Sequence, residues 1–251
     1  MWPFGTLCAD AQGRIGHSEG ARPPTASPTA QTQRTPGSLR LHPEGFHGDR
    51  HLQALVRSIL PEVRGFIETG TNVGTTACWV ARNAPDLPIR SCEASDEAAE
   101  HARENLSAFA QAEVRHESSP GFLEGLGKRE PDLMNAPGLW WLDAHGWGFQ
   151  WPLAQEVAWI TKRCDSGFIL IDDFKVPGRD WFKHDVYDGQ VCGLEMVEPA
   201  LAPELSYTLT LPTYSEHTSK HHPLIGVGLI RWGVRWALPE ALADLFEDRP
   251  L

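Results

Sequence analysis

Three aspartates follow two apolar segments of the chain, where carboxylates could hold a metal ion or handle protons. Asp143 ends the segment GLWWLD, Asp172 ends the segment GFILID, and Asp173 follows directly. If both segments are parallel strands, their carboxyl ends open onto one edge of the sheet, so the three side chains are expected to converge. Carboxylates at such range cannot all stay ionised without a cation, and Mg²⁺ prefers oxygen ligands. Asp143, Asp172 and Asp173 are therefore candidate metal ligands. A purely structural role for Asp172 and Asp173, in capping loops, is the open alternative.

A histidine close to the first aspartate adds a second chemical group. His145 belongs to the string Trp141-Leu142-Asp143-Ala144-His145. An imidazole titrates near physiological pH, so His145 could take the proton of a substrate hydroxyl. It could equally hold Asp143 in place by a hydrogen bond. Asp143 and His145 are the catalytic candidates, and these two roles for His145 stay open.

A glycine-rich turn is the third feature with chemical content. The string Glu68-Thr69-Gly70-Thr71-Asn72-Val73-Gly74 follows a short apolar segment and opens a helical pattern. A dinucleotide fingerprint has the spacing GxGxxG and places a pyrophosphate at the helix N-terminus. Here the spacing is ExGxxxG, and the acid Glu68 would repel a pyrophosphate but suits a ligand with an ammonium and a sulfonium. Glu93, about 20 residues further on, is placed to accept hydrogen bonds from ribose hydroxyls.

These groups need a layered α/β domain to position them. Short apolar segments alternate with amphipathic helical patterns, and the expected strands are 65–68, 87–93, 113–117, 138–143 and 167–172. This alternation is typical of a doubly wound, mostly parallel sheet with helices on both faces. Two further strands, over 205–211 and 224–232, are joined by a polar loop and are expected to form a C-terminal antiparallel hairpin. The expected sheet is seven-stranded.

The glycine turn and this order of elements resemble those of class I S-adenosylmethionine (SAM)-dependent methyltransferases, which have a Rossmann-like fold. The strings ETGTNVG, WLDAH and LIDD also resemble a methyltransferase-like group related to metal-dependent O-methyltransferases. The resemblance implies SAM as cofactor and O-methylation of a small-molecule hydroxyl, with Mg²⁺ assistance. Family members often contact adenine just after the third strand, where Ser118 stands here. The cofactor-binding residues implied are Glu68, Thr69, Gly70, Thr71, Asn72, Gly74, Glu93, Ser118 and Asp143.

Composition and charge narrow the partners and the compartment. Residues 1–45 contain a stretch dense in Pro, Thr, Ser, Ala and Gln and are predicted to be a disordered tail, with the methyltransferase domain over 46–251. A formal net charge of −11 makes nucleic acid an unfavourable partner. The five scattered cysteines argue against a disulfide scaffold, and no apolar stretch suits a bilayer or a secretory signal. We expect a cytoplasmic protein with a small-molecule substrate, no membrane partner, and an open oligomeric state that includes a homo-oligomer.

Two other function classes compete with methyl transfer. A nicotinamide-dependent oxidoreductase shares the layered architecture, but the ExGxxxG spacing argues against it. A non-catalytic SAM-binding protein is the second alternative, and the convergent acids argue against it. The aromatic and charged segment 174–191 and the histidine-containing loop 212–223 are expected to border the substrate site, the first as a lid.

Overall fold

The computed structural model describes residues 44–144, 151–187 and 189–251. Apart from Glu44 and Gly45, the tail predicted over 1–45 lies outside these ranges and stays a prediction. Within the described ranges, no helix combines the length and the apolar character needed to cross a bilayer.

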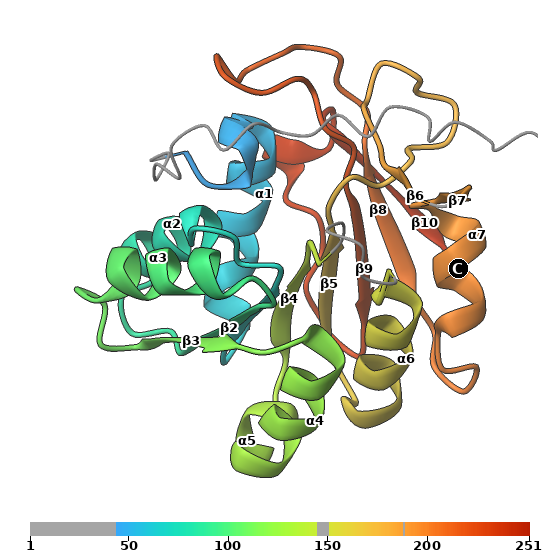
Figure 1. The fold of residues 1–251 in the computed structure, drawn as a ribbon. Helices are drawn as coiled ribbons and strands as arrows, with labels where there is room; N and C mark the ends of the chain where they lie inside the picture. Colours follow the sequence, from blue (N-terminus) through green and yellow to red (C-terminus); the bar gives the residue numbers. More distant parts are fainter. Residues whose placement is uncertain (1–43, 145–150, 188) are drawn as a thin grey trace, which may run out of the picture. The chain divides into compact units, whose positions relative to one another are not determined.

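The centre of the fold is an eight-stranded sheet with the order β10-β8-β9-β5-β4-β1-β2-β3 (Figure 1). Strands β1 to β5 pair in parallel, whereas β9 is antiparallel to both β5 and β8. The predicted doubly wound, mostly parallel sheet with an antiparallel hairpin after it is therefore confirmed. The strands are β1 (Phe66–Thr69), β2 (Ile89–Glu93), β3 (Ala112–His116), β4 (Gly138–Leu142), β5 (Gly167–Ile171), β8 (Thr208–Pro212), β9 (Gly228–Trp232) and β10 (Phe246–Pro250).

The sheet has one strand more than the seven predicted. Strand β10 pairs with β8 in antiparallel register, from Phe246 opposite Pro212 to Pro250 opposite Thr208. Its sequence, FEDRP, is charged and ends in proline, so it has no alternating apolar pattern to mark it. Charged residues and proline are typical of edge strands, because they discourage pairing with another chain. Because of these charged residues, a search of the sequence for alternating apolar residues does not find this strand.

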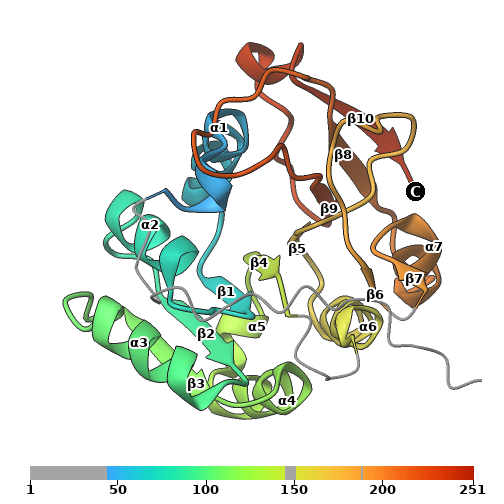
Figure 2. The same ribbon diagram turned by 45° about the horizontal axis from the view of Figure 1, so that its top comes forward.

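Helices cover both faces of the sheet (Figures 1 and 2). On one face lie α1 (Arg50–Ile59), α2 (Thr75–Asn83) and α3 (Asp96–Leu106), and on the other α4 (Ser119–Arg129), α6 (Leu153–Arg163) and α7 (Leu194–Val197). The remaining short elements are α5 (Pro131–Met134), η1 (Phe46–Gly48), η2 (Leu60–Glu62), η3 (Glu198–Ala200), η4 (Glu240–Leu242), and the two-stranded β6 (Val186–Tyr187) and β7 (Gln190–Val191).

Two adjacent tryptophans of β4 show how the layers separate. The Trp141 ring faces Phe46, with ring centroids 5.0 Å apart, whereas Trp140 faces Trp159 of α6 at 6.3 Å. Successive side chains of a strand point to opposite faces, so one continuous apolar strand serves both layers. Since Asp143 follows Trp141 by two residues, the strand pattern directs it to the face covered by α1 and α2.

Candidate functional site

The glycine turn joins the end of β1 to α2 by close backbone packing. Gly70 has a φ of 78°, and a Cβ added there would lie 2.6 Å from the carbonyl carbon of Asp143. The amides of Gly70 and Thr71 both donate to the carbonyl of Cys92, each at 3.0 Å. No side chain fits at Gly70, because the left-handed backbone and the clash both exclude it. The turn is thus fixed between the ends of β2 and β4.

Glu68, on β1 just before this turn, is a buried carboxylate. Its relative exposure is 1 %, and its Oε2 has no hydrogen-bond partner among the described residues. Burial, and after it the negative charge of Asp143, raise the pKa of Glu68 well above its usual range. A buried polar atom without a partner is costly, so this oxygen is suited to receive a ligand donor or a positive charge.

Glu93, the predicted ribose contact, has a structural role in this fold. Its Oε2 accepts the amide of Asn72 at 2.8 Å, and its Oε1 accepts the amide of Ser95 at 2.8 Å. Glu93 therefore ties the glycine turn to the residue that caps α3. Each carboxylate oxygen has a second lone pair, so contacts with ribose hydroxyls stay available. The ribose role stays a prediction.

The other predicted cofactor residues lie at the same edge or near it. Gly74 caps α2 with a φ of 82°, and Asn72 also has a positive φ, of 50°. Thr71 donates its hydroxyl to the carbonyl of Cys92, whereas Thr69 is fully buried. Ser118 caps α4 by position, without a side-chain hydrogen bond to that helix. Contact of these residues with a cofactor stays a prediction.

The three predicted carboxylates converge. Each of Asp143, Asp172 and Asp173 offers an oxygen, and these oxygens all lie within 4.8 Å of one another. The amide of Asp143 donates to Thr69, and the amide of Asp172 donates to Leu142, so each continues its strand ladder by one step. Asp173 has a left-handed φ of 50°. The predicted convergence is confirmed, while service as metal ligands stays a prediction.

A histidine that sequence reasoning missed completes the cluster. His47 Nε2 lies 2.7 Å and 2.9 Å from the two carboxylate oxygens of Asp172. Burial lowers the pKa of His47, but the charge and hydrogen bond of Asp172, with the charges of Asp143 and Asp173, outweigh it and raise that pKa to about 9. The string Gly-Phe-His-Gly has no helical or strand periodicity, so only its glycines signalled an unusual backbone. His145, the predicted catalytic histidine, lies outside the described residues.

Two loops border this cluster. One is the predicted lid, 174–191, and the other is the β8–β9 loop, residues 213–227. They are joined by backbone hydrogen bonds, from Lys183 to Leu224 at 2.8 Å and from Gly226 to Lys183 at 2.7 Å. In addition, the indole of Trp181 donates to the carbonyl of Tyr214 at 2.9 Å. These hydrogen bonds join the two loops to each other. The lid function stays a prediction.

No protein-family model matches the sequence, and no curated protein matches it. Solved structures match in fold. The O-methyltransferase TomG from Streptomyces achromogenes, involved in tomaymycin synthesis and solved with SAM, has a TM-score of 0.50 and 19 % identity, over 72 % of this chain and 77 % of that chain. The O-methyltransferase from Bacillus cereus, solved with S-adenosylhomocysteine, has a TM-score of 0.50 and 18 % identity, over 72 % and 78 %. The chain thus has the fold of class I SAM-dependent methyltransferases, as the resemblance implied.

Proposed function

We propose that this chain is a SAM-dependent O-methyltransferase that acts on a hydroxyl of a small molecule with the help of Mg²⁺. The observation that carries the proposal is the direct backbone contact between Gly70 and Asp143. This contact places the glycine turn, which suits the cofactor, beside the first carboxylate of the cluster, which suits the acceptor. The methyl donor and the acceptor hydroxyl would meet at this contact.

The cofactor side favours a cation over a phosphate. Glu68 is buried, and its Oε2 has no hydrogen-bond partner in the part of the chain that the structure describes, so a cationic ligand would supply the missing donor or charge. A pyrophosphate there would instead add negative charge next to Glu68, Glu93 and Asp143. SAM, when bound, supplies an electrophilic methyl group on a sulfonium sulfur. The same argument disfavours a nicotinamide dinucleotide.

The carboxylate cluster has the donor chemistry of a site for a hard divalent cation. Its members offer only oxygen, and their oxygens lie within 4.8 Å of one another. Asp143, Asp172 and Asp173 would hold the ion, and His47 already contacts Asp172. A bound Mg²⁺ supplies Lewis acidity, which lowers the pKa of a hydroxyl and orients its oxygen.

The contribution of the chain itself is placement and charge. The glycine turn fixes one reactant and the cluster orients the other, which lowers the entropic part of the barrier. Methyl transfer forms a carbon–oxygen bond as the carbon–sulfur bond breaks, and the sulfur keeps the electron pair. The hydroxyl proton would pass to a base, and the carboxylates of the cluster are the candidates for that base.

Calorimetric titration with S-adenosylhomocysteine, with and without Mg²⁺, tests this proposal. We expect micromolar binding of S-adenosylhomocysteine, weakened at least tenfold by Glu93→Ala if Glu93 holds the ribose hydroxyls. The control Glu100→Gln removes an exposed charge on α3 and should leave binding unchanged. Absence of binding in both conditions would overturn the cofactor assignment. Binding of S-adenosylhomocysteine with no heat signal on addition of Mg²⁺ would overturn the metal assignment and leave the cofactor assignment intact.

A further inference from the structure

The segment just before α1 holds two consecutive residues in a strained conformation. Phe46 and His47 both have a φ of 56°, in the left-handed region that residues with a side chain rarely adopt. Such a conformation persists only where the surroundings over-determine it, and it is typically found at functional sites. His47 is also the residue that contacts Asp172. The strained backbone and the carboxylate cluster therefore meet at one side chain.

Packing fixes this segment on its N-terminal side. Phe46 is fully buried, with its ring centroid 5.2 Å from that of Trp79 and 5.0 Å from that of Trp141. Gly45 has no room for a side chain, because an added Cβ would meet the Trp79 ring. The Gln53 side chain donates to the Gly45 carbonyl at 2.9 Å. Phe46 thus anchors the backbone from which His47 projects.

Asp49 fixes the segment on its C-terminal side, and it binds two elements at once. Its Oδ1 caps α1 by accepting the amides of His51 at 2.9 Å and Leu52 at 3.3 Å. Its Oδ2 accepts the hydroxyl of Tyr214, from the β8–β9 loop, at 2.6 Å. Burial, and after it the charge of Asp49, raise the pKa of Tyr214, so its hydroxyl stays a donor.

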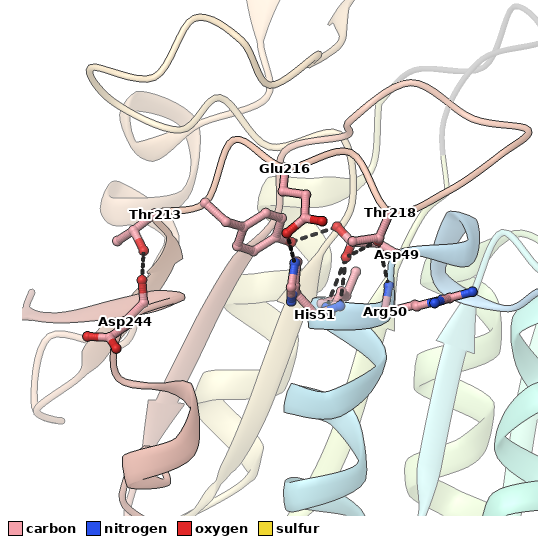
Figure 3. Close-up of polar contacts among 9 residues, drawn as sticks. Asp49, Arg50, His51, Thr213, Glu216, Thr218 and Asp244 are labelled. Atoms are coloured by element: carbon pink, nitrogen blue, oxygen red, sulfur yellow. Dashed lines mark hydrogen bonds and ion pairs between the residues drawn. The ribbon is translucent and has the colours of Figure 1, made fainter.

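A second contact reinforces this connection. Thr218, further along the β8–β9 loop, accepts the amide of Arg50 at 2.9 Å and donates to Asp49 at 3.3 Å (Figure 3). The loop then continues to His222, whose ring centroid lies 5.4 Å from that of His47. The loop therefore contacts the start of α1 at Asp49 and Arg50 and reaches the cluster again at His47.

We propose that Asp49 and Tyr214 are positioning residues that fasten the β8–β9 loop to the start of α1 and thereby hold His47 on the Asp172 carboxylate. The inference rests on the proposed function only in treating Asp172 as part of the site. A loop fastened for stability alone would lower the free energy of unfolding when cut, but it would leave the hydrogen bond between His47 and Asp172 intact. The two roles differ in this observable.

Tyr214→Phe distinguishes a positioning role from a purely stabilising one, because it removes one hydroxyl and keeps the ring that packs on Phe182 and Phe246. Nuclear magnetic resonance of the ligand-free protein follows the ring N–H of His47, which His47→Gln assigns. In the wild-type protein we expect a downfield signal protected from solvent by Asp172. In Tyr214→Phe we expect its exchange with solvent, and that of the amides of His51 and Leu52, to rise about tenfold or more.

Thr213→Val is the matched control. The Thr213 hydroxyl begins the same loop but donates to the carbonyl of Asp244 at 2.9 Å, away from α1 (Figure 3). It should leave the His47 signal as in the wild-type protein. Thr218→Val, a milder cut of the same connection, should shift the signal in the direction of Tyr214→Phe by a smaller amount. It also serves if Tyr214→Phe does not fold.

Two results would overturn the proposal. One is an unchanged His47 signal in Tyr214→Phe and Thr218→Val. The other is an equal change in Thr213→Val, which would mean general loosening of the loop. Neither result depends on a ligand, so failure here is distinct from failure of the titrations with S-adenosylhomocysteine and Mg²⁺. If those titrations fail while the His47 signal responds, the connection stands and only the assigned chemistry falls.

Discussion

Two regions of the molecule are built in different ways. One is the glycine-turn region, residues 68–74, and the other is the proposed acceptor region, which consists of the carboxylate cluster, His47 and the β8–β9 loop. Around the turn, contacts involve backbone groups. The amide of Asn72 donates to Glu93, 21 positions away, and the backbone of Gly70 packs on that of Asp143. On the acceptor side, contacts join side chains that are remote in sequence. His47 reaches Asp172 across 125 positions, and Tyr214 reaches Asp49 across 165. The first region depends on backbone packing at the ends of β1, β2 and β4, and the second depends on side-chain contacts between segments that are remote in sequence.

This difference has a consequence for how each region responds to change. Backbone packing at Gly70 leaves no room for any side chain, so a single substitution there should disrupt the conformation of the whole turn. The acceptor side is held by individual hydrogen bonds on loops, each of which can be weakened separately. Loops on a rigid scaffold are where substrate preference commonly resides. We therefore expect large effects at the turn and graded effects on the acceptor side.

Gly70→Ala should have the largest effect. It forces a side chain into a left-handed backbone and against Asp143, at a combined cost of about 2–5 kcal/mol in the free energy of unfolding. Urea unfolding and titration with S-adenosylhomocysteine measure both stability and binding, and binding should be lost.

Gly178→Ala is the control for that variant. Gly178 has a similar φ of 74°, but nothing lies within 4 Å of an added Cβ. It should cost only about 1–2 kcal/mol and leave binding unchanged. Equal losses in both variants would show that the contact with Asp143 adds nothing beyond the backbone conformation.

Asp143→Ala should separate the two regions. It keeps the backbone on which Gly70 packs, so binding of S-adenosylhomocysteine should fall far less than in Gly70→Ala, even if the Asp143 side chain also contacts the cofactor. It removes one carboxylate of the cluster, so Mg²⁺ affinity should fall at least tenfold, as titration of the protein bound to S-adenosylhomocysteine would show. Turnover of an identified acceptor should be abolished. Full retention of Mg²⁺ affinity would contradict the place of Asp143 in the cluster.

The sequence predicted the parallel half of the fold because β4 and β5 are continuously apolar and each βα unit is local. The glycine turn and the convergence of Asp143 with Asp172 follow from strand ends alone. His47 could not be found this way. Its partner is remote in sequence, and its neighbours Phe46 and Gly48 have positive φ values that no periodicity encodes. Contacts between residues that are remote in sequence depend on the topology of the fold, so they become visible only in the structure.

The helix α4 has a weak sequence signal for a different reason. Its sequence, SPGFLEGLGKR, contains three glycines, which favour a loop assignment. In the structure, Phe122, Leu123 and Leu126 are buried on one side of this helix. Tertiary packing therefore overrides the low helix propensity. Strand β10 also has a weak sequence signal, but there the cause is its charged residues, which suit an edge strand and interrupt the apolar pattern.

Glu68→Gln should have a smaller effect, with a sign that depends on pH. The pKa of Glu68 is raised in the folded protein, by burial first and by Asp143 second, so its contribution to stability is present below the unfolded pKa and is lost as pH rises. Wild-type stability should therefore decline relative to Glu68→Gln above about pH 4.3. Urea unfolding of both proteins across this range measures it. Parallel pH profiles would contradict the raised pKa.

Asp248→Asn should have the smallest effect and should touch neither region. At the outer edge of the sheet, Arg231 donates to both carboxylate oxygens of Asp248, at 2.8 Å and 2.6 Å. This pair is partly exposed, so its loss should cost about 1 kcal/mol. Burial raises the pKa of Asp248, but hydrogen bonds from Arg231 and Thr210 overcome it and lower that pKa.

The stability supplied by Asp248 should therefore be present above its unfolded pKa and lost as pH falls through the folded value. The difference in urea midpoint between wild-type protein and Asp248→Asn should shrink below about pH 4. Asp244→Asn removes the same charge from an exposed neighbouring residue and should show no such trend. If Asp248→Asn also weakened binding of S-adenosylhomocysteine or changed the His47 signal, the edge strands would be coupled to both regions. The two regions would then have to be treated as one unit with the antiparallel edge, because a change at β10 would reach them through β8 and β9.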